Sequence, residues 1–193
     1  AVLSGAGVGG GSLVYANTLY EPLAPFYVDP QWGHITDWRA ELMPHYEQAK
    51  RMLGVVQNPT FTDADRLMKE VADEMGVGDT FTPTPVGVFF GSDGQQCPGK
   101  TVPDPYFGGA GPARTGCTEC GECMTGCRHG AKNTLVKNYL ALAEKAGAQV
   151  IPMTTVTGFG QRADGVWDVD TVRTGRSRRG AGKTYTADHV VLA

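Results

Sequence analysis

The stretch SGAGVGGGSLVYANTLY, residues 4–20, determines the expected fold, because five glycines within seven positions separate an apolar start from a short apolar run. Gly5, Gly7 and Gly10 fit the G-x-G-x-x-G spacing of a dinucleotide-binding turn. That fingerprint also needs a full crossover helix, a second strand and an acidic residue ~20 positions later. Pro22 ends the helical run too early for this arrangement.

A second interpretation makes this stretch an additional glycine loop of a flavoprotein. Gly9, Gly10 and Gly11 have no Cβ, so the backbone can lie against a diphosphate or the edge of an isoalloxazine ring. Amide groups at the start of the following helix suit anionic oxygens. An ordinary tight turn is the alternative.

The composition argues against a nucleic-acid-binding protein and against a membrane-spanning one. The 193 residues carry a net charge of -3, so a basic nucleic-acid-binding surface is not expected. No apolar run reaches the ~18 residues of a membrane span, and the start AVLSGAGVGG lacks the features of a signal peptide. We expect a cytoplasmic protein without a transmembrane segment.

Both ends of the sequence consist of apolar residues typical of buried strands. Residues 1–4 lead into the glycines, and His189-Val190-Val191-Leu192-Ala193 stops with nothing after it. A buried strand needs neighbours to pair its backbone groups. We therefore expect an internal piece of a longer protein, the alternative being a natural end on an edge strand.

Two helices are expected in the middle of the chain. Asp37 is a candidate N-cap for a helix that Gly54 closes, with Pro44 predicting a kink or a late start. A second helix is expected over Thr62 to Met75, ending at Gly76. The apolar positions that share one face of each helix are Leu42, Tyr46, Ala49 and Leu53 in the first and Ala64, Leu67, Met68, Val71 and Met75 in the second.

The last third predicts a helix followed by strands. A helical stripe begins after Ala131 and stops at Gly147, and apolar stretches follow at 148–151, 154–159, 166–172 and 184–192. Ala163-Asp164-Gly165 is a hairpin turn between two of them. Helix, strand, antiparallel pair and closing strand together predict a mixed α/β fold with an inserted β-meander.

Four of the five cysteines follow the spacing C-x2-C-x2-C-x3-C, namely Cys117, Cys120, Cys123 and Cys127. This is the spacing of a bacterial [4Fe-4S] half-site, although Arg128 replaces the usual proline. Reduced thiols in a tight loop, a zinc site and disulfides remain as alternatives. Cys97 is expected to be a lone thiol.

Two stretches together resemble the glucose-methanol-choline (GMC) oxidoreductases, and particularly their cholesterol-oxidase-like members. They are GVGGGSLVYANTLYEP at 7–22 and CTECGECMTGCRHGAKNTLVKNYLALAEKAGAQVIPMTTVTGF at 117–159. The resemblance implies a partial FAD-binding Rossmann-like domain. It assigns residues 1–21 and 117–193 to that domain and residues 22–116 to a helical and loop cover segment.

The resemblance also implies where FAD would be contacted. Gly10, Gly11 and Ser12 would lie beside the flavin and its diphosphate, and Tyr15, Ala16, Asn17 and Thr18 would follow the isoalloxazine. Family members often carry Asn and Gly around positions 15 and 16, so the sequence departs from the family there. Val156 matches the position whose backbone contacts the adenine.

The implied chemistry is oxidation of an alcohol by hydride transfer to the flavin, with a histidine base on the hydroxyl proton. That base would lie beyond Ala193, so none of His34, His45, His129 or His189 is assigned a catalytic role. The expected substrate is a 3β-hydroxysteroid, and oxygen is the expected electron acceptor. One alternative is a flavin dehydrogenase that passes electrons through a cluster at the cysteines. Another is a small iron-sulfur or metal-binding electron-transfer module without flavin.

Overall fold

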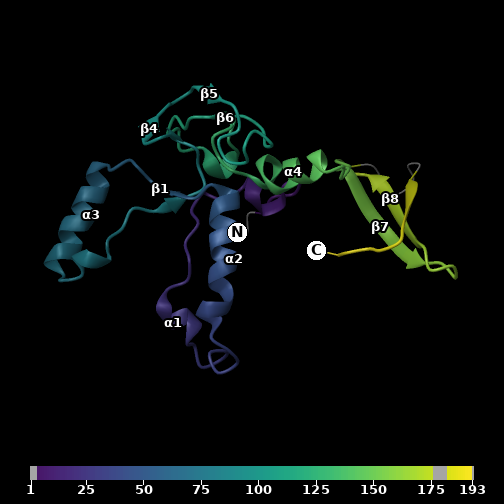
Figure 1. Ribbon diagram of the computed structural model, residues 1–193, viewed down its shortest axis with the longest axis horizontal. Helices are drawn as coiled ribbons and strands as arrows, with labels where there is room; N and C mark the ends of the chain where they lie inside the picture. Colours follow the sequence, from purple (N-terminus) through teal and green to yellow (C-terminus); the bar gives the residue numbers. More distant parts are fainter. Residues whose placement is uncertain (1–3, 176–181, 193) are drawn as a thin grey trace. The chain divides into compact units, whose positions relative to one another are not determined.

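The computed structural model describes residues 4–175 and 182–192, which fall into two units (Figure 1). The first unit extends to Ala148 and the second begins at Gln149. The first unit combines short helices with small antiparallel sheets and the second contains a three-stranded antiparallel sheet, which together confirm the mixed fold class. The strand expected at the very start and the basic loop around 176–181 lie outside the described residues.

Helix α2, Trp38–Leu53, is the longest helix of the first unit and follows the short α1, Ala24–Tyr27. The carboxylate of Asp37 accepts a hydrogen bond from the Ala40 amide at 3.1 Å, which satisfies one of the free N–H groups of the first turn. Gly54 ends the helix in a left-handed conformation at φ 57°. The predicted cap and end are therefore confirmed. The helix continues through Pro44, so a late start is not observed.

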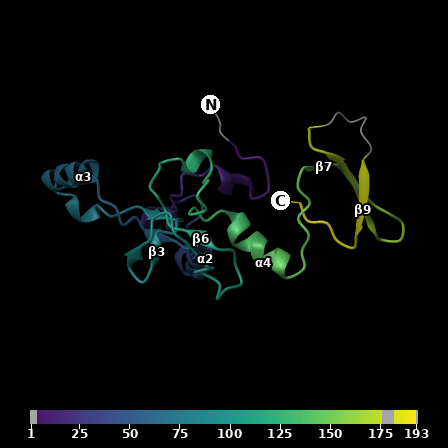
Figure 2. The same ribbon diagram turned by 90° about the horizontal axis from the view of Figure 1, so that it is seen from above.

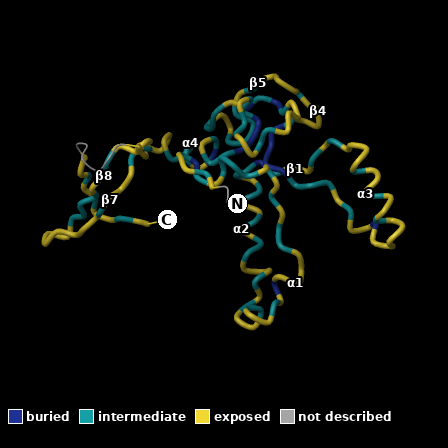
Figure 3. The backbone as a smooth tube through the Cα atoms, turned by 180° about the vertical axis from the view of Figure 1, so that it is seen from behind, coloured by how far each residue is buried: buried dark blue, intermediate teal, exposed yellow. Residues whose placement is uncertain are grey.

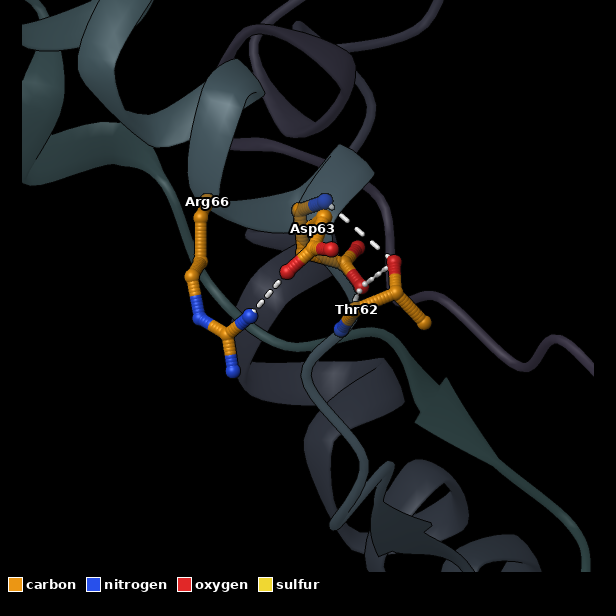
Figure 4. Close-up of polar contacts among 4 residues, drawn as sticks. Thr62, Asp63 and Arg66 are labelled. Carbon is orange, nitrogen blue, oxygen red and sulfur yellow. Dashed lines mark hydrogen bonds and ion pairs between the residues drawn. The ribbon is translucent and has the colours of Figure 1, made fainter.

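Helix α3, Asp63–Glu74, begins with a reciprocal cap (Figure 4). The Asp65 amide donates to the Thr62 hydroxyl, and the Thr62 amide donates to the Asp65 carboxylate at 2.7 Å. An ion pair between Arg66 and Asp63 adds to this first turn. The sequence prediction for this helix is confirmed.

Most residues of α3 are exposed to solvent (Figure 3), including those of its apolar face. Its large side chains are Leu67, Met68, Val71 and Met75. Each of them keeps 50% or more of its surface exposed. The predicted periodicity is therefore present, although no other described residues bury this face.

Among residues 4–175 and 182–192, no helix has both the length and the apolarity that crossing a membrane requires.

Three two-stranded antiparallel sheets complete the first unit. Asp93 and Gly94, with φ of 54° and 74°, form the tight turn of the middle sheet. The strand pairs are β1 (Val56–Gln57) with β2 (Pro85–Val86), β3 (Gly91–Ser92) with β4 (Gln95–Gln96), and β5 (Thr101–Val102) with β6 (Arg114–Thr115).

The apolar core of the first unit is small. Val86, Val88 and Ala131 are its buried members. Phe90, Cys117 and Cys127 pack against them and are only partly buried. The predicted strand at 85–90 is regular only over β2, yet Phe89 still bonds both Ala131 and Cys117 through its backbone. The cysteine run is therefore attached directly to the core.

A buried arginine organises the other side of this core. Arg114, 1% exposed, donates from Nε to the Asn133 side-chain oxygen at 2.8 Å and from Nη2 to the Lys137 carbonyl at 2.5 Å. Its guanidinium lies 5.3 Å from the Tyr106 ring centroid. Because a buried charge must be solvated by the protein, these contacts fix the positions of three segments.

The helix predicted after the glycine turn is much shorter than expected. Only Gly10–Leu13 is helical, as the 3₁₀ helix η1. Thr18 forms an isolated antiparallel bridge with Val86, and the Leu19 amide donates to the Pro85 carbonyl at 2.9 Å. Pairing with a distant strand therefore overrides the helical preference of SLVYANTLY.

The helix predicted after Ala131 is divided in two. The 3₁₀ helix η4, Leu135–Lys137, is followed by α4, Tyr139–Lys145. Asn138 separates them with φ −133° and ψ −95°, and its side-chain oxygen accepts from the Tyr139 amide at 2.6 Å. The predicted stop at Gly147 is confirmed by its φ of 101°. The remaining short helices are η2 (Gly78–Thr80) and η3 (Cys123–Thr125).

The second unit contains an antiparallel three-stranded meander (Figure 2). Its strands are β7 (Thr154–Gln161), β8 (Trp167–Arg173) and β9 (Lys183–Ala187). The predicted hairpin turn is confirmed, with Gly165 at φ 87°. No strand forms at 148–151.

The closing strand was predicted to reach residue 192 and ends instead at Ala187. Val191, 88% exposed, lies beyond it without sheet pairing. In the described part of the chain no neighbouring strand is available to pair these residues, so their β propensity has no effect.

Candidate functional site

A turn of glycines forms the first part of the candidate site. Gly9 and Gly10 adopt left-handed conformations, at φ 107° and 52°, which a side chain would strain. The Gly10 amide donates to the Gly7 carbonyl at 3.0 Å. A Cβ added at Gly10 or Gly11 would meet no atom within 4 Å. The outer side of this turn is therefore open backbone.

Ser12 anchors the turn from within. Its hydroxyl donates to the Gly9 carbonyl at 2.7 Å and accepts from the Leu135 amide at 3.0 Å. Both hydrogen-bonding roles of the hydroxyl are thus used inside the protein. The backbone of Ser12, rather than its side chain, is left to serve a ligand.

Tyr15 belongs to the same internal framework. Its hydroxyl donates to the Asn133 carbonyl at 3.0 Å, across 118 positions of sequence. Burial and the nearby Cys123 thiol together raise the pKa of Tyr15 to about 12. The phenol therefore remains protonated as a hydrogen-bond donor at neutral pH.

Lys132 connects the glycine turn to the cysteine run. It is 1% exposed, and its ammonium donates to the carbonyls of Leu13, Tyr15 and Cys123 at 3.0, 2.9 and 2.7 Å. The ammonium also lies 4.7 Å from the centroid of the Tyr15 ring. Burial lowers the pKa of Lys132, although the Cys123 and Cys127 thiols oppose this shift. Sequence reasoning missed Lys132, because a single lysine carries no pattern that predicts burial.

Asn17 forms a second connection between the same segments. The side-chain amide of Asn17 donates to the Cys123 sulfur at 3.0 Å. The backbone carbonyl of Asn17 accepts from the Gly87 amide at 2.8 Å. The residue has φ 63°, a left-handed conformation that asparagine tolerates better than most residues. Ala16 and Thr18, its neighbours, are exposed.

All four cysteines of the run line one cavity of about 240 Å³. Asn17, His129 and Lys132 are also among its lining residues. Cys120 is exposed, whereas the other three thiols are half-buried. The four residues of the predicted metal site therefore share one cavity, and Cys97 does not line it.

The thiols of Cys117 and Cys127 have opposite pKa shifts. Burial raises the pKa of Cys117, and the nearby Cys123 and Cys127 thiols add to this effect. Burial also acts to raise the pKa of Cys127, but backbone N–H groups from His129 to Lys132 outweigh it and lower the pKa. The Cys127 sulfur therefore lies in an environment that favours its thiolate.

Metal-binding geometry is not present in residues 4–175 and 182–192. No group of three or more histidine, cysteine, aspartate or glutamate side chains is arranged there to hold a metal ion. A zinc ion would need its sulfur ligands at ~2.3 Å from a common point. The four thiols share a cavity without converging in this way.

Val156 lies in the second unit, on strand β7. It pairs with Thr171 of β8, and a β-bulge follows between Val156 and Gly158. Val156 keeps 53% of its surface exposed. The residue is therefore on an accessible part of the sheet, and its adenine role remains a prediction.

Comparison with known proteins gives the family. Residues 110–193 match the family model described as GMC oxidoreductase. The chain is 77% identical over 192 residues to proteins named cholesterol oxidase from two strains of Mycobacterium tuberculosis, CDC 1551 / Oshkosh and ATCC 25618 / H37Rv. It is 51% identical over 155 residues, 80% of this chain, to a protein named cholesterol oxidase from Acinetobacter baumannii.

The matches cover this chain more completely than they cover the relatives. The Mycobacterium alignments include 100% of this chain and 33% of each relative, and the Acinetobacter alignment includes 28% of its relative. The chain thus spans about a third of the length of the curated relatives it matches. The glycine turn, the cysteine run and the meander all lie within the aligned 192 residues, and the chain belongs to the GMC oxidoreductase family.

Proposed function

We propose that the chain is a segment of an FAD-dependent oxidoreductase that oxidises an alcohol carbon. The observation that carries this proposal is the 77% identity, over the whole chain, to proteins named cholesterol oxidase. Identity at this level extends across the glycine turn and the segments that hold it. Its chemistry would therefore follow that of these relatives.

The open backbone of the glycine turn fits a dinucleotide cofactor. Above Gly10 and Gly11 there is space that any side chain would fill, and a diphosphate needs such close approach to main-chain amides. We assign the main chain of Gly10, Gly11 and Ser12 to this part of FAD. When bound, FAD would supply the hydride acceptor for alcohol oxidation.

Other residues of the chain would hold the remaining parts of FAD. Tyr15, Ala16, Asn17 and Thr18 would follow the flavin ring through their backbone, since Tyr15 and Asn17 use their side chains internally. The Val156 backbone would contact the adenine. Lys132 would keep the turn in place by binding the Leu13 and Tyr15 carbonyls.

For the substrate we propose a 3β-hydroxysteroid, with oxygen as the electron acceptor. The names of the two groups of relatives support the sterol assignment. A dehydrogenase that passes electrons from the flavin to another acceptor is the second candidate, and the cavity lined by all four cysteines of the run is the observation that favours it.

Anaerobic mixing of the full-length protein with cholesterol tests this function. We expect a yellow protein whose flavin absorption bleaches on mixing and returns when oxygen enters, with one hydrogen peroxide per turnover. A colourless protein, or one that sterol does not bleach, would contradict the proposal. Bleaching followed by reduction of a dye, without peroxide, would instead identify the dehydrogenase.

A further inference from the structure

Lys132 carries a buried positive charge that no negative side chain neutralises. The residue is 1% exposed, and its ammonium donates to three carbonyl oxygens, those of Leu13, Tyr15 and Cys123. Within residues 4–175 and 182–192, no carboxylate forms an ion pair with it. The carbonyl groups solvate the charge but leave a net positive charge inside the protein.

The hydrogen bonds of Lys132 require its charged form. An ammonium has three N–H donors, whereas a neutral amine has two donors and one lone pair. With carbonyl oxygens at 3.0, 2.9 and 2.7 Å, a neutral amine would direct its lone pair at one of these oxygens. Burial acts to lower the pKa of Lys132, yet the three contacts favour the ammonium. All three N–H groups are used, so a neutralising partner would have to displace one of the carbonyls.

Three titratable side chains lie near this ammonium, those of Tyr15, Cys123 and Cys127. The pKa of Tyr15 is raised to about 12, so the phenol is neutral at neutral pH. Burial acts to raise the pKa of Cys127, but backbone N–H groups outweigh it and the pKa is lowered. A Cys127 thiolate would oppose the effect of the ammonium, so a variant at Cys127 belongs in the test.

The ammonium lies against the segment that joins the glycine turn to the residues assigned to the flavin ring. It binds the Leu13 and Tyr15 carbonyls and lies 4.7 Å from the centroid of the Tyr15 ring. Lys132 is therefore one hydrogen bond away from the main chain that would follow the isoalloxazine. In a protein interior a charge acts over a longer distance than in water, because the effective dielectric constant is lower.

A fixed positive charge at this place has a direct consequence for flavin chemistry. Reduction adds electrons, and with them negative charge, to the flavin. A nearby cation stabilises the reduced form more than the oxidised form. Charge placed near the flavin ring is one of the means by which a protein tunes this cofactor.

We propose that the buried ammonium of Lys132 raises the reduction potential of the FAD bound at the glycine turn. This inference rests on the proposed function, because it requires FAD beside residues 10–18. It adds an electrostatic role to the structural link that Lys132 makes. Loss of the link would lower stability and FAD affinity, whereas loss of the charge would also lower the potential of the FAD that remains bound.

The test is an anaerobic redox titration of FAD bound to the full-length protein, against an indicator dye of known potential. Two neutral variants remove the charge, Lys132→Met and Lys132→Gln. In each of them we expect the equilibrium constant for two-electron reduction to fall roughly tenfold or more, which is a decrease of about 30 mV or more. Lys132→Arg keeps the charge and should keep the wild-type potential.

Two further variants serve as controls. Lys145→Met removes a lysine at the exposed end of α4 and should leave the potential unchanged. Cys127→Ser changes the neighbouring cavity while keeping the ammonium, so its potential should equal or exceed that of the wild type. Urea denaturation and flavin titration of every variant separate changes in stability and FAD affinity from changes in potential.

Three results would overturn the inference. The first is a wild-type potential in both neutral variants, even if these are less stable. The second is a potential in Lys132→Arg as low as that in Lys132→Met, because geometry rather than charge would then set it. The third is an equal decrease in Cys127→Ser.

The comparison with free FAD decides the question if neither neutral variant retains the cofactor. Reduction of FAD in the wild-type protein should then be more favourable than reduction of free FAD in the same buffer, and a potential at or below that of free FAD would overturn the inference. A full-length protein that takes up no FAD would overturn both this inference and the proposed function. Failure of sterol to bleach the bound flavin would contradict the proposed function alone, because the dye titration does not use sterol.

Discussion

The side-chain amide of Asn17 donates a hydrogen bond to the sulfur of Cys123, 106 residues further along the chain. Asn17 also holds a left-handed backbone conformation, with φ 63°. One residue therefore shapes the end of the glycine segment and attaches it to the cysteine run.

Replacing Asn17 with glycine separates these two roles, because glycine accepts the same backbone conformation and removes only the side chain. Loss of one hydrogen bond costs about 0.5–1.5 kcal/mol, so we expect FAD affinity of the full-length protein to fall roughly two- to tenfold. Flavin titration measures the change. Asp93→Gly, at a left-handed turn position in the β3–β4 hairpin, is the control and should bind FAD normally. Unchanged affinity in Asn17→Gly would show that the contact does not support the flavin loop.

Replacing Lys132 with methionine should have a larger effect. The change keeps most of the side-chain volume but leaves the carbonyls of Leu13, Tyr15 and Cys123 without their shared donor. We expect a loss of about 2–4 kcal/mol in the free energy of unfolding, measured by urea denaturation. Lys145→Met, at the exposed end of α4, is the control. Equal stability of the two variants would exclude Lys132 as a structural link.

Adding one methyl group at Gly11 tests the cofactor position directly. The new Cβ would meet no protein atom within 4 Å, so Gly11→Ala should fold as stably as the wild type. It would occupy space assigned to FAD, and we expect at least a tenfold weaker FAD affinity, about 1.4 kcal/mol. Gly160→Ala in β7 also has free space around its Cβ and should leave the affinity unchanged. Normal FAD binding by Gly11→Ala would place the cofactor elsewhere.

The loop after β5 should become less stable at acid pH. The Asp104 carboxylate accepts hydrogen bonds from four amides, those of Tyr106, Phe107, Gly109 and Gly111. Burial acts to raise the pKa of Asp104, but these hydrogen bonds outweigh it and the pKa is lowered. A lowered pKa gives a stabilisation that is present above the unfolded value of ~3.9 and is lost as pH falls through the folded pKa.

Urea denaturation of the wild type and Asp104→Asn between pH 6 and pH 3 measures this effect. We expect the wild type to be more stable at pH 6 and the difference to shrink below about pH 4, as the carboxylate is protonated. Asp79→Asn, at an exposed position, is the control variant. A difference that stays constant with pH would rule out the carboxylate as its source.

The cap of α3 should control the stability of its first turn. Thr62→Ala removes the hydroxyl that accepts from the Asp65 amide and should cost about 1 kcal/mol. Amide hydrogen exchange near residue 65 should then be about five times faster. The exposed Thr82→Ala is the control. An unchanged exchange rate would mean that the cap does not limit opening of this turn.

The structural features that the sequence predicted correctly depend on residues that are close together in the sequence. The cap at Asp37, the stop at Gly54 and the turn at Gly165 each depend on residues within a few positions. The four cysteines of the run also lie close together in sequence and line one cavity, whereas their role as metal ligands remains a prediction.

The parts that were predicted wrongly or missed depend on distant residues. The run after Gly11 was expected to be helical, but Thr18 pairs with Val86 instead. Lys132 and Arg114 gave no periodic signal, and only the folded chain shows that both are buried among carbonyl groups. Sequence patterns report propensities of neighbours and do not report such long-range pairings.

The link between Lys132 and the Leu13 carbonyl spans 119 positions of sequence. During synthesis, the glycine turn leaves the ribosome long before the ammonium that holds it has been made. The contact between the turn and this ammonium can therefore form only after more than a hundred further residues have been synthesised. It adds a long-range closure to the local hydrogen bonds of the glycine turn.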